Sequence, residues 1–254
     1  MHDDLKLGFS TLSVFMKPPE SWEGIARGDE FNALEILCEG PMWPRAGLWK
    51  STIEGLGGNG MEVYMHSPTI DLNPASVNGG IREETLRQLK ETIDMASGIK
   101  ARFVTTHPGV IHRPDPFILD MCREFAMVVL GEASDYAKEN GVILSIENMP
   151  FRKTYLCGTS EELDMFRERC GSNVTIDVGH AILSPDPMSF LRLKNISYLH
   201  VNDNKGDKDS HLCPGDGILD LNMLKCCDRM IIELNRYDNV LRARDIILDT
   251  LQAR

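Results

Sequence analysis

The chain has 254 residues, of which 42% are hydrophobic and 26% are charged, and its formal net charge is −11. This composition is that of an ordinary globular protein, and the length is sufficient for one α/β barrel. A strong negative charge disfavours unspecific binding to nucleic acid or anionic membranes, because like charges repel. No apolar run reaches the length of a membrane span, and the acidic start at residues 1–4 does not have the pattern of a signal peptide.

The sequence contains seven cysteines, an odd number, and no Cys-x-x-Cys pair. This usage is typical of a protein whose thiols stay reduced, so we expect a cytoplasmic location. A structural zinc site built on cysteine is not expected, and Cys226-Cys227 is interpreted as packing on a short helix.

Apolar stretches alternate with amphipathic ones along the whole chain. Continuous apolar runs are typical of parallel strands that are buried on both faces, and their alternation with helices predicts a single-domain (β/α)8 TIM barrel over residues 1–254. A doubly wound sheet is the alternative, but no Gly-x-Gly-x-x-Gly follows a predicted strand. The predicted strands are 5–9, 31–37, 62–66, 103–107, 142–147, 174–177, 196–201 and 230–234. The predicted helices are 22–27, 45–56, 81–97, 116–140, one that begins at Thr159 or Ser160, 187–193, 221–227 and 240–252.

Histidines and carboxylates occur at the ends of six consecutive predicted strands, from the third to the eighth. In a parallel barrel all strand C-termini open on one face, here called the mouth, where active sites are built. A lone histidine at a strand end is more often a structural, hydrogen-bonded residue, but that explanation would have to hold at nine separate positions. Imidazole and carboxylate together suit Zn²⁺, Mn²⁺, Co²⁺ or Fe²⁺ better than Ca²⁺. The residues are His66, His107, Glu147, Asp177, His180, His200, Asp209, His211 and Glu233.

Two further residues are candidates for substrate contact. Trp43 follows the second predicted strand and could line the site, although packing in the core is the more common role of a tryptophan. Lys205 lies on a loop of the mouth, where most cations are solvated but one or two could clamp a phosphate or a polar substrate.

Short segments at these strand ends resemble the superfamily of xylose isomerase-like sugar isomerases and epimerases and of endonuclease IV-type enzymes (AP endonuclease family 2). Their order and strand spacing carry the resemblance, which covers nearly the whole chain. The segments are His66-Ser67-Pro68, His107-Pro108-Gly109, Glu147-Asn148, Asp177-Val178-Gly179-His180, His200-Val201-Asn202-Asp203, Asp209-Ser210-His211, Gly215-Asp216-Gly217 and Glu233-Leu234.

The resemblance to the sugar epimerases implies one divalent metal held by Glu147, Asp177, His200 and Glu233. In that branch Glu147 and Glu233 also flank the substrate as an acid–base pair, and His66 and His107 would bind substrate or tune the metal. A metal polarises adjacent sugar oxygens while carboxylates move a proton. The implied ion is zinc or manganese, with magnesium or cobalt as alternatives, and the implied substrate is a small sugar or sugar phosphate.

The resemblance to endonuclease IV implies a cluster of three zinc ions instead. The ligand sets that match the three positions are His66, His107 and Glu147; Asp177, His200 and Glu233, with Glu147 bridging; and His180, Asp209 and His211.

Two features depart from the endonuclease branch. Thr69 stands where that branch has an aromatic residue that enters DNA. The net charge of −11 also differs from the excess of basic residues that is typical of DNA-binding proteins. We therefore expect a metal-dependent sugar isomerase or epimerase. A phosphodiesterase acting on abasic DNA is the alternative, and a metal-binding barrel without turnover is the third. The sequence leaves open the substrate, the number of metals between one and three, and a homo-oligomer.

Overall fold

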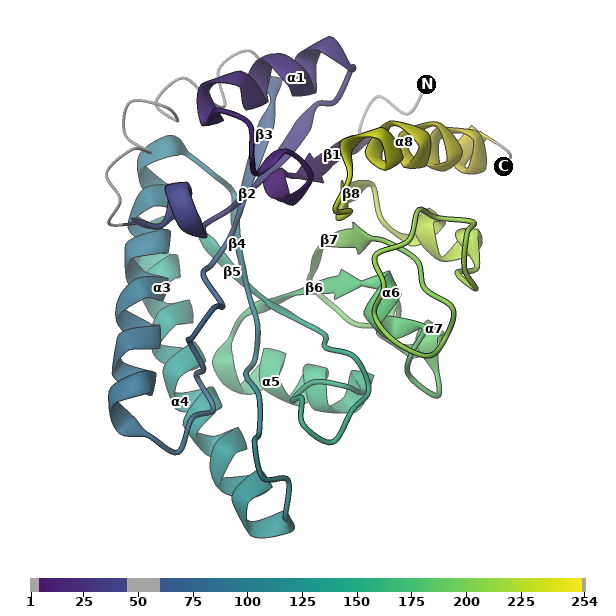
Figure 1. Ribbon diagram of the computed structural model, residues 1–254. Coiled ribbons are helices and arrows are strands. Elements are labelled where there is room, and N and C mark those ends of the chain that lie inside the picture. The colour runs from purple at the N-terminus through teal and green to yellow at the C-terminus, as the bar shows by residue number, and fades with distance from the viewer. Residues whose placement is uncertain (1–4, 45–59, 253–254) are drawn as a thin grey trace.

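Eight parallel strands pair in chain order, and β8 pairs with β1 to close a barrel (Figure 1). The structure, a computed structural model, describes residues 5–44 and 60–252. The predicted (β/α)8 TIM barrel is confirmed. The strands are β1 (Lys6–Ser10), β2 (Ala33–Leu37), β3 (Glu62–His66), β4 (Phe103–Thr106), β5 (Ile143–Glu147), β6 (Asn173–Asp177), β7 (Ile196–Val201) and β8 (Arg229–Ile232).

Helices surround the barrel, and the two longest, α3 and α4, lie side by side (Figure 1). The α-helices are α1 (Trp22–Gly28), α3 (Gly79–Ile99), α4 (Pro116–Glu139), α5 (Ser160–Cys170), α6 (Val178–Ala181), α7 (Pro187–Phe190) and α8 (Tyr237–Gln252). The 3-10 helices include η1 (Thr11–Val14), η2 (Pro19–Ser21), η3 (Gly40–Met42) and η6 (Leu221–Cys226), the last of which occupies the predicted helix 221–227. The helix predicted at 45–56 lies outside the described residues.

Side-chain caps determine where the principal helices begin. The side chain of Asn78 accepts a hydrogen bond from the Gly80 amide, so α3 begins two residues before the predicted start. Asp115 and Thr159 cap α4 and α5 in the same way. Each cap satisfies an amide that has no partner within the helix.

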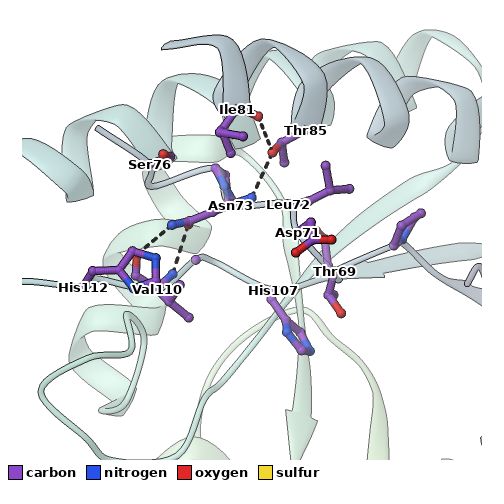
Figure 2. Close-up of a pocket in the computed structure, with 14 residues that line it drawn as sticks. Thr69, Asp71, Leu72, Asn73, Ser76, Ile81, Thr85, His107, Val110 and His112 are labelled. Atoms are coloured by element: carbon purple, nitrogen blue, oxygen red, sulfur yellow. Dashed lines mark hydrogen bonds between the residues drawn. The ribbon is translucent and has the colours of Figure 1, made fainter. Parts of the chain in front are cut away.

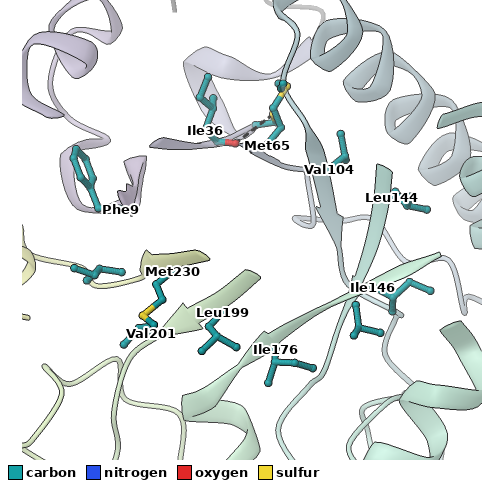
Figure 3. Close-up of a cluster of buried hydrophobic side chains, with 14 of the residues drawn as sticks. Phe9, Ile36, Met65, Val104, Leu144, Ile146, Ile176, Leu199, Val201 and Met230 are labelled. Atoms are coloured by element: carbon teal, nitrogen blue, oxygen red, sulfur yellow. Dashed lines mark hydrogen bonds between the residues drawn. The ribbon is translucent and has the colours of Figure 1, made fainter. Parts of the chain in front are cut away.

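Alternate residues of each strand face opposite sides of the barrel wall. Apolar side chains on the outer side, among them Ile36, Met65, Val104 and Leu199, form the large core between strands and helices (Figure 3). The inner side is less apolar than continuous apolar strands would suggest. It holds a small aromatic cluster of Ala33, Tyr64, Phe103, Tyr198 and Ile231.

This inner cluster fills the barrel below the mouth. The rings of Tyr64 and Tyr198 stack at 4.7 Å between centroids. The hydroxyl of Tyr198 also bonds Thr105 Oγ1, which bonds Thr175 Oγ1. The interior is therefore a packed support rather than a channel.

Within residues 5–44 and 60–252, no helix combines the length and apolar character needed to cross a bilayer.

Candidate metal centre

Each candidate ligand at a strand end comes two residues after a side chain of the same strand that points into the barrel. Because side chains along a strand alternate between faces, residues two apart share a face. His66 thus follows Tyr64, His200 follows Tyr198, and Glu233 follows Ile231. The same spacing applies to Glu35 after Ala33, His107 after Thr105, Glu147 after Ser145 and Asp177 after Thr175.

Glu147, the last residue of β5, is the centre of the site. Its Oε2 lies 3.3 Å from Nε2 of both His66 and His107. Its Oε1 lies 3.2 Å from His200 Nδ1. The Glu147 side chain is 1% exposed, so these contacts are shielded from solvent. One carboxylate therefore joins ligand atoms from three other strand ends.

Two groups of residues offer ligand atoms that all lie within 4.8 Å of one another. The first is His66, His107 and Glu147. The second is Glu147, Asp177, His200 and Glu233. The predicted first and second ligand sets are thus brought together, with Glu147 shared between them.

The predicted third set has a different arrangement. Asp209 Oδ2 lies 3.3 Å from His180 Nε2 and 3.1 Å from His211 Nε2, so the aspartate links the two rings. Over the part of the chain that the structure describes, the ligand atoms of these three residues do not all lie as close together as those of the first two groups. Asp209 Oδ1 is buried without a hydrogen-bond partner.

Backbone carbonyls orient three of the histidines. Nδ1 of His66 donates to Ser67 O (2.9 Å), that of His180 to Asn148 O (2.8 Å) and that of His211 to Glu233 O (2.9 Å). A carbonyl oxygen can only accept, so Nδ1 carries the hydrogen and Nε2 faces the carboxylates. This is the usual arrangement of metal-binding histidines.

His200 has the reverse orientation. Its Nδ1 faces Glu147 and Glu233, at 3.2 and 3.5 Å, and its Nε2 lies 2.8 Å from Glu35 Oε2. All four groups come from different strands or strand ends, so this contact exists only in the closed barrel.

The carboxylates hold protons on most of these histidines when no metal is bound. Burial alone would lower the pKa of His66, but Glu147 outweighs it and raises the pKa to about 9. Burial is likewise outweighed at His180, where Asp177 and Asp209 raise the pKa to about 10. His107 is the exception, since burial lowers its pKa.

The two glutamates of the second group have opposite pKa shifts. Burial raises the pKa of Glu233 to about 7, although His200 and His211 oppose the shift. Burial also disfavours the charged form of Glu147, but His200, His107 and His66 hold its pKa well below the usual range. Opposed shifts within a pair of carboxylates are the pattern of an acid–base pair.

The donor set fits a divalent transition metal. Histidine nitrogen and carboxylate oxygen are the ligands that zinc and manganese share. The protons on the histidines supply positive charge among several buried carboxylates, and a cation would replace them. The buried, unpartnered Asp209 Oδ1 is a further free acceptor.

Glu35 is a site residue that the sequence prediction missed. It lies in the middle of β2 within the apolar stretch 33–37, is fully buried, and one oxygen, Oε1, has no hydrogen-bond partner. A charged residue inside an apolar strand is costly unless it is paired. That signal, together with the two-residue spacing from Ala33, could have identified it.

A cavity of about 420 Å³ opens beside His107 (Figure 2). Asn73 stabilises the wall of this cavity. Its side chain bonds both the backbone amide and the carbonyl of Val110 (3.1 and 2.8 Å), and its backbone amide donates to Thr85 Oγ1 (3.0 Å). A Cβ on Gly109 would clash with Asn73, and the φ of +113° also favours glycine. The loops after β3 and β4 are thus joined into one rigid wall.

The two predicted substrate contacts lie at different places. Trp43 donates from Nε1 to Gln88 Oε1 (2.6 Å) and lines a second cavity, which shares Asp71 with the first. Lys205 is exposed on the loop after β7 and lines neither cavity. Its role as a substrate contact stays a prediction.

Several known proteins are similar to this chain. An uncharacterised protein of Methanocaldococcus jannaschii is 31% identical over 89% of this chain and 80% of its own length. The structure of a D-tagatose 3-epimerase-like protein is 25% identical, with a TM-score of 0.88 and 98% of each chain covered. Fructoselysine 3-epimerase of Shigella flexneri is 26% identical over 65% of this chain and 62% of its own length.

Endonuclease IV of Thermus thermophilus has a TM-score of 0.70 and 19% identity, and covers 98% of this chain and 100% of its own. At that identity the likeness shows the fold alone. The family model described as xylose isomerase-like TIM barrel matches residues 24–229. The chain therefore belongs to the xylose isomerase-like TIM barrel family.

Proposed function

We propose that the protein is a divalent-metal-dependent isomerase or epimerase that moves a proton on a small sugar. The observation that carries this proposal is the pair Glu147 and Glu233, which belong to one group of ligand atoms and both face His200 Nδ1, at 3.2 and 3.5 Å. The similarity to proteins named as sugar 3-epimerases supports it.

Glu147, Asp177, His200 and Glu233 would hold the metal, which when bound polarises the carbonyl and hydroxyl oxygens of a sugar. Glu147 is ionised near neutral pH and is suited to accept a proton from carbon. Glu233 faces the same nitrogen of His200 as Glu147 does, at 3.5 and 3.2 Å, and would return a proton to the sugar. His66 and His107 lie on the other side of Glu147 and would contact sugar hydroxyls.

The cavity beside His107 favours an unphosphorylated substrate. Its lining includes Asp71 and His112 and, among the described residues, neither Lys nor Arg. Bound phosphates usually require guanidinium, ammonium or several backbone amides. A ketose with a neutral or cationic tail is therefore the substrate class that this wall fits best.

Hydrogen exchange tests the reaction directly. The metal-replete protein should incorporate solvent deuterium beside the carbonyl of at least one ketose in a panel, and the unphosphorylated sugars should exchange faster than their phosphates. Glu147→Gln and Glu233→Gln should each lower the exchange rate about 10²–10⁴-fold. Absence of exchange across a broad panel would count against the proposal.

Glu62→Gln is the matched control. Glu62 begins β3 at the opposite end of the barrel, where it lies 3.4 Å from Arg229 and accepts from the Tyr64 hydroxyl at 2.6 Å. This variant should exchange at nearly the wild-type rate.

We propose zinc or manganese as the metal, with magnesium or cobalt as alternatives. Elemental analysis of protein purified without added metal would identify it. A wild-type protein with one bound ion per chain, and an Asp177→Asn variant with none, would support the epimerase site. Three zinc ions per chain would favour the second candidate below.

The second candidate is an endonuclease IV-like phosphodiesterase, favoured by one observation. Beyond the two ligand groups, His180, Asp209 and His211 are linked through a single carboxylate oxygen close to Glu147. Incision of a duplex that contains an abasic site, at low salt with zinc, tests it. Lack of both incision and binding would reject it.

The cysteines are consistent with a cytoplasmic location. All seven are free, and five of them are buried. Unpaired thiols are usual in a reducing compartment.

A further inference from the structure

We propose that Glu35 is a positioning residue for the metal centre. Its carboxylate would hold the hydrogen of His200 on Nε2, so that the Nδ1 lone pair is directed at the metal position between Glu147 and Glu233. The inference rests on the proposed function only in that the site binds a metal.

The contact is short and fully shielded. Glu35 Oε2 lies 2.8 Å from His200 Nε2, and both side chains are 0% exposed. On the opposite side of the ring, Nδ1 lies 3.2 Å from Glu147 Oε1 and 3.5 Å from Glu233 Oε2. One carboxylate thus contacts one nitrogen of the ring while the opposite nitrogen faces two others that could hold a metal, an arrangement that would orient a ligand and raise its basicity.

A second donor fixes Glu35. The Tyr198 hydroxyl lies 2.6 Å from the same Oε2, two residues before His200 on β7. Tyr198 is itself held by Thr105 and by stacking on Tyr64. The carboxylate therefore cannot follow the ring if the ring rotates, and it determines the orientation of the ring.

The contrast with the other histidines argues for this role. Three of them use a neutral backbone carbonyl to fix the hydrogen. His200 alone among those four uses a carboxylate taken from the middle of an apolar strand. A buried carboxylate is destabilising, and an apolar residue would serve the fold of β2 better. Its presence is explained if it acts on the ligand.

Metal affinity is the test, measured by competition with a chelator at one pH. Glu35→Ala should weaken zinc binding about 10–100-fold, the usual effect of removing such a partner. Glu35→Gln keeps an acceptor oxygen and should lose less. Ser145→Ala is the control, because it removes a buried hydrogen bond to Ser197 and none of the hydrogen bonds described here for Glu35 and His200. It should bind zinc as the wild type does.

Two results would overturn the inference. The first is a Glu35→Ala protein that is less stable but binds zinc within twofold of the wild type, which is the result expected of an ordinary core ion pair. The second comes from the wild type alone and does not depend on a variant that folds. In nitrogen-15 NMR of the zinc-loaded protein, His200 should carry hydrogen on Nε2 and metal on Nδ1, and the opposite assignment would contradict the role.

These outcomes separate the inference from the proposed function. If the wild type binds zinc but exchanges no sugar, the sugar reaction fails while the affinity test still decides the role of Glu35. If the wild type binds no metal, both fail.

Discussion

At the scale of single residues, the position of Asp177 depends on close packing around it. Asn202 Nδ2 donates to Asp177 Oδ2 (2.8 Å), and Asn148 bonds both the amide and the carbonyl of Asp177 (2.7 and 3.0 Å). A Cβ on Gly179 would overlap Asn202 Oδ1. Glycine is therefore required here by space, since Asn202 cannot move without releasing the carboxylate.

Gly179→Ala should consequently reduce both stability and metal binding. Forcing a methyl group into this packing should cost about 1–3 kcal/mol, and displacement of Asn202 should weaken zinc binding. Chemical denaturation and chelator competition measure the two effects. Gly24→Ala is the control: a Cβ there meets nothing within 4 Å, and alanine favours the helix α1 by about 0.5–1 kcal/mol. Equal stability of the two variants would contradict the packing argument.

At the scale of elements, Asp203 organises the loop between β7 and η6. It is 0% exposed, and its carboxylate accepts four backbone hydrogen bonds, from the amides of Asn204, Gly215, Gly217 and Leu219 (2.8–3.0 Å). This explains the glycine at position 217, since a Cβ there would overlap the Asp203 carboxylate and the Asn204 carbonyl. The loop carries Asp209 and His211 to the mouth.

Asp203→Ala should release this loop. Four amides would lose a charged acceptor, which should cost about 3 kcal/mol or more. Hydrogen–deuterium exchange should accelerate over residues 204–219 and remain slow in β3 to β5. In contrast, Asp207→Ala removes a carboxylate that accepts from the neighbouring Lys208 amide and should leave the pattern unchanged. Slow exchange of the loop in Asp203→Ala would show that other contacts hold it.

At the scale of the whole molecule, the charges of the mouth couple stability to pH. Without metal, the pKa values of His66 and His211 are raised to about 9 and that of His180 to about 10, chiefly by neighbouring carboxylates acting against burial. A pKa raised by folding contributes stability that is complete below the unfolded value, near 6.5, and is lost as pH rises through the folded value.

The metal-free protein should therefore melt at lower temperature as pH rises from 7 to 10. A loss of 1 kcal/mol corresponds to about 2–4 °C for a chain of this size. The gain in melting temperature that zinc gives over the metal-free protein should increase as pH rises. A metal needs the histidines deprotonated and therefore binds more tightly at higher pH. Melting curves with chelator and with zinc measure both trends. A melting temperature of the metal-free protein that stays constant over this pH range would contradict the assigned charges.

The barrel itself was predictable because its signals are local. Apolar strands, amphipathic helices, and caps such as Asn78 and Thr159 are properties of neighbouring residues, so the order of elements can be read along the chain. The family resemblance follows from the same strand ends. The first and second ligand groups could be expected for the same reason, since barrel closure brings consecutive strand ends to one mouth.

By itself the sequence determined the (β/α)8 fold, the family and the face on which polar residues gather. Only the tertiary structure decided how those residues pair. Glu35 and His200 are 165 positions apart in the chain yet lie 2.8 Å apart, and His180 and His211 meet through one oxygen of Asp209. The physical reason is that such contacts depend on barrel closure and on loops held by buried groups such as Asp203, whereas periodicity in the sequence reports only which face a residue occupies.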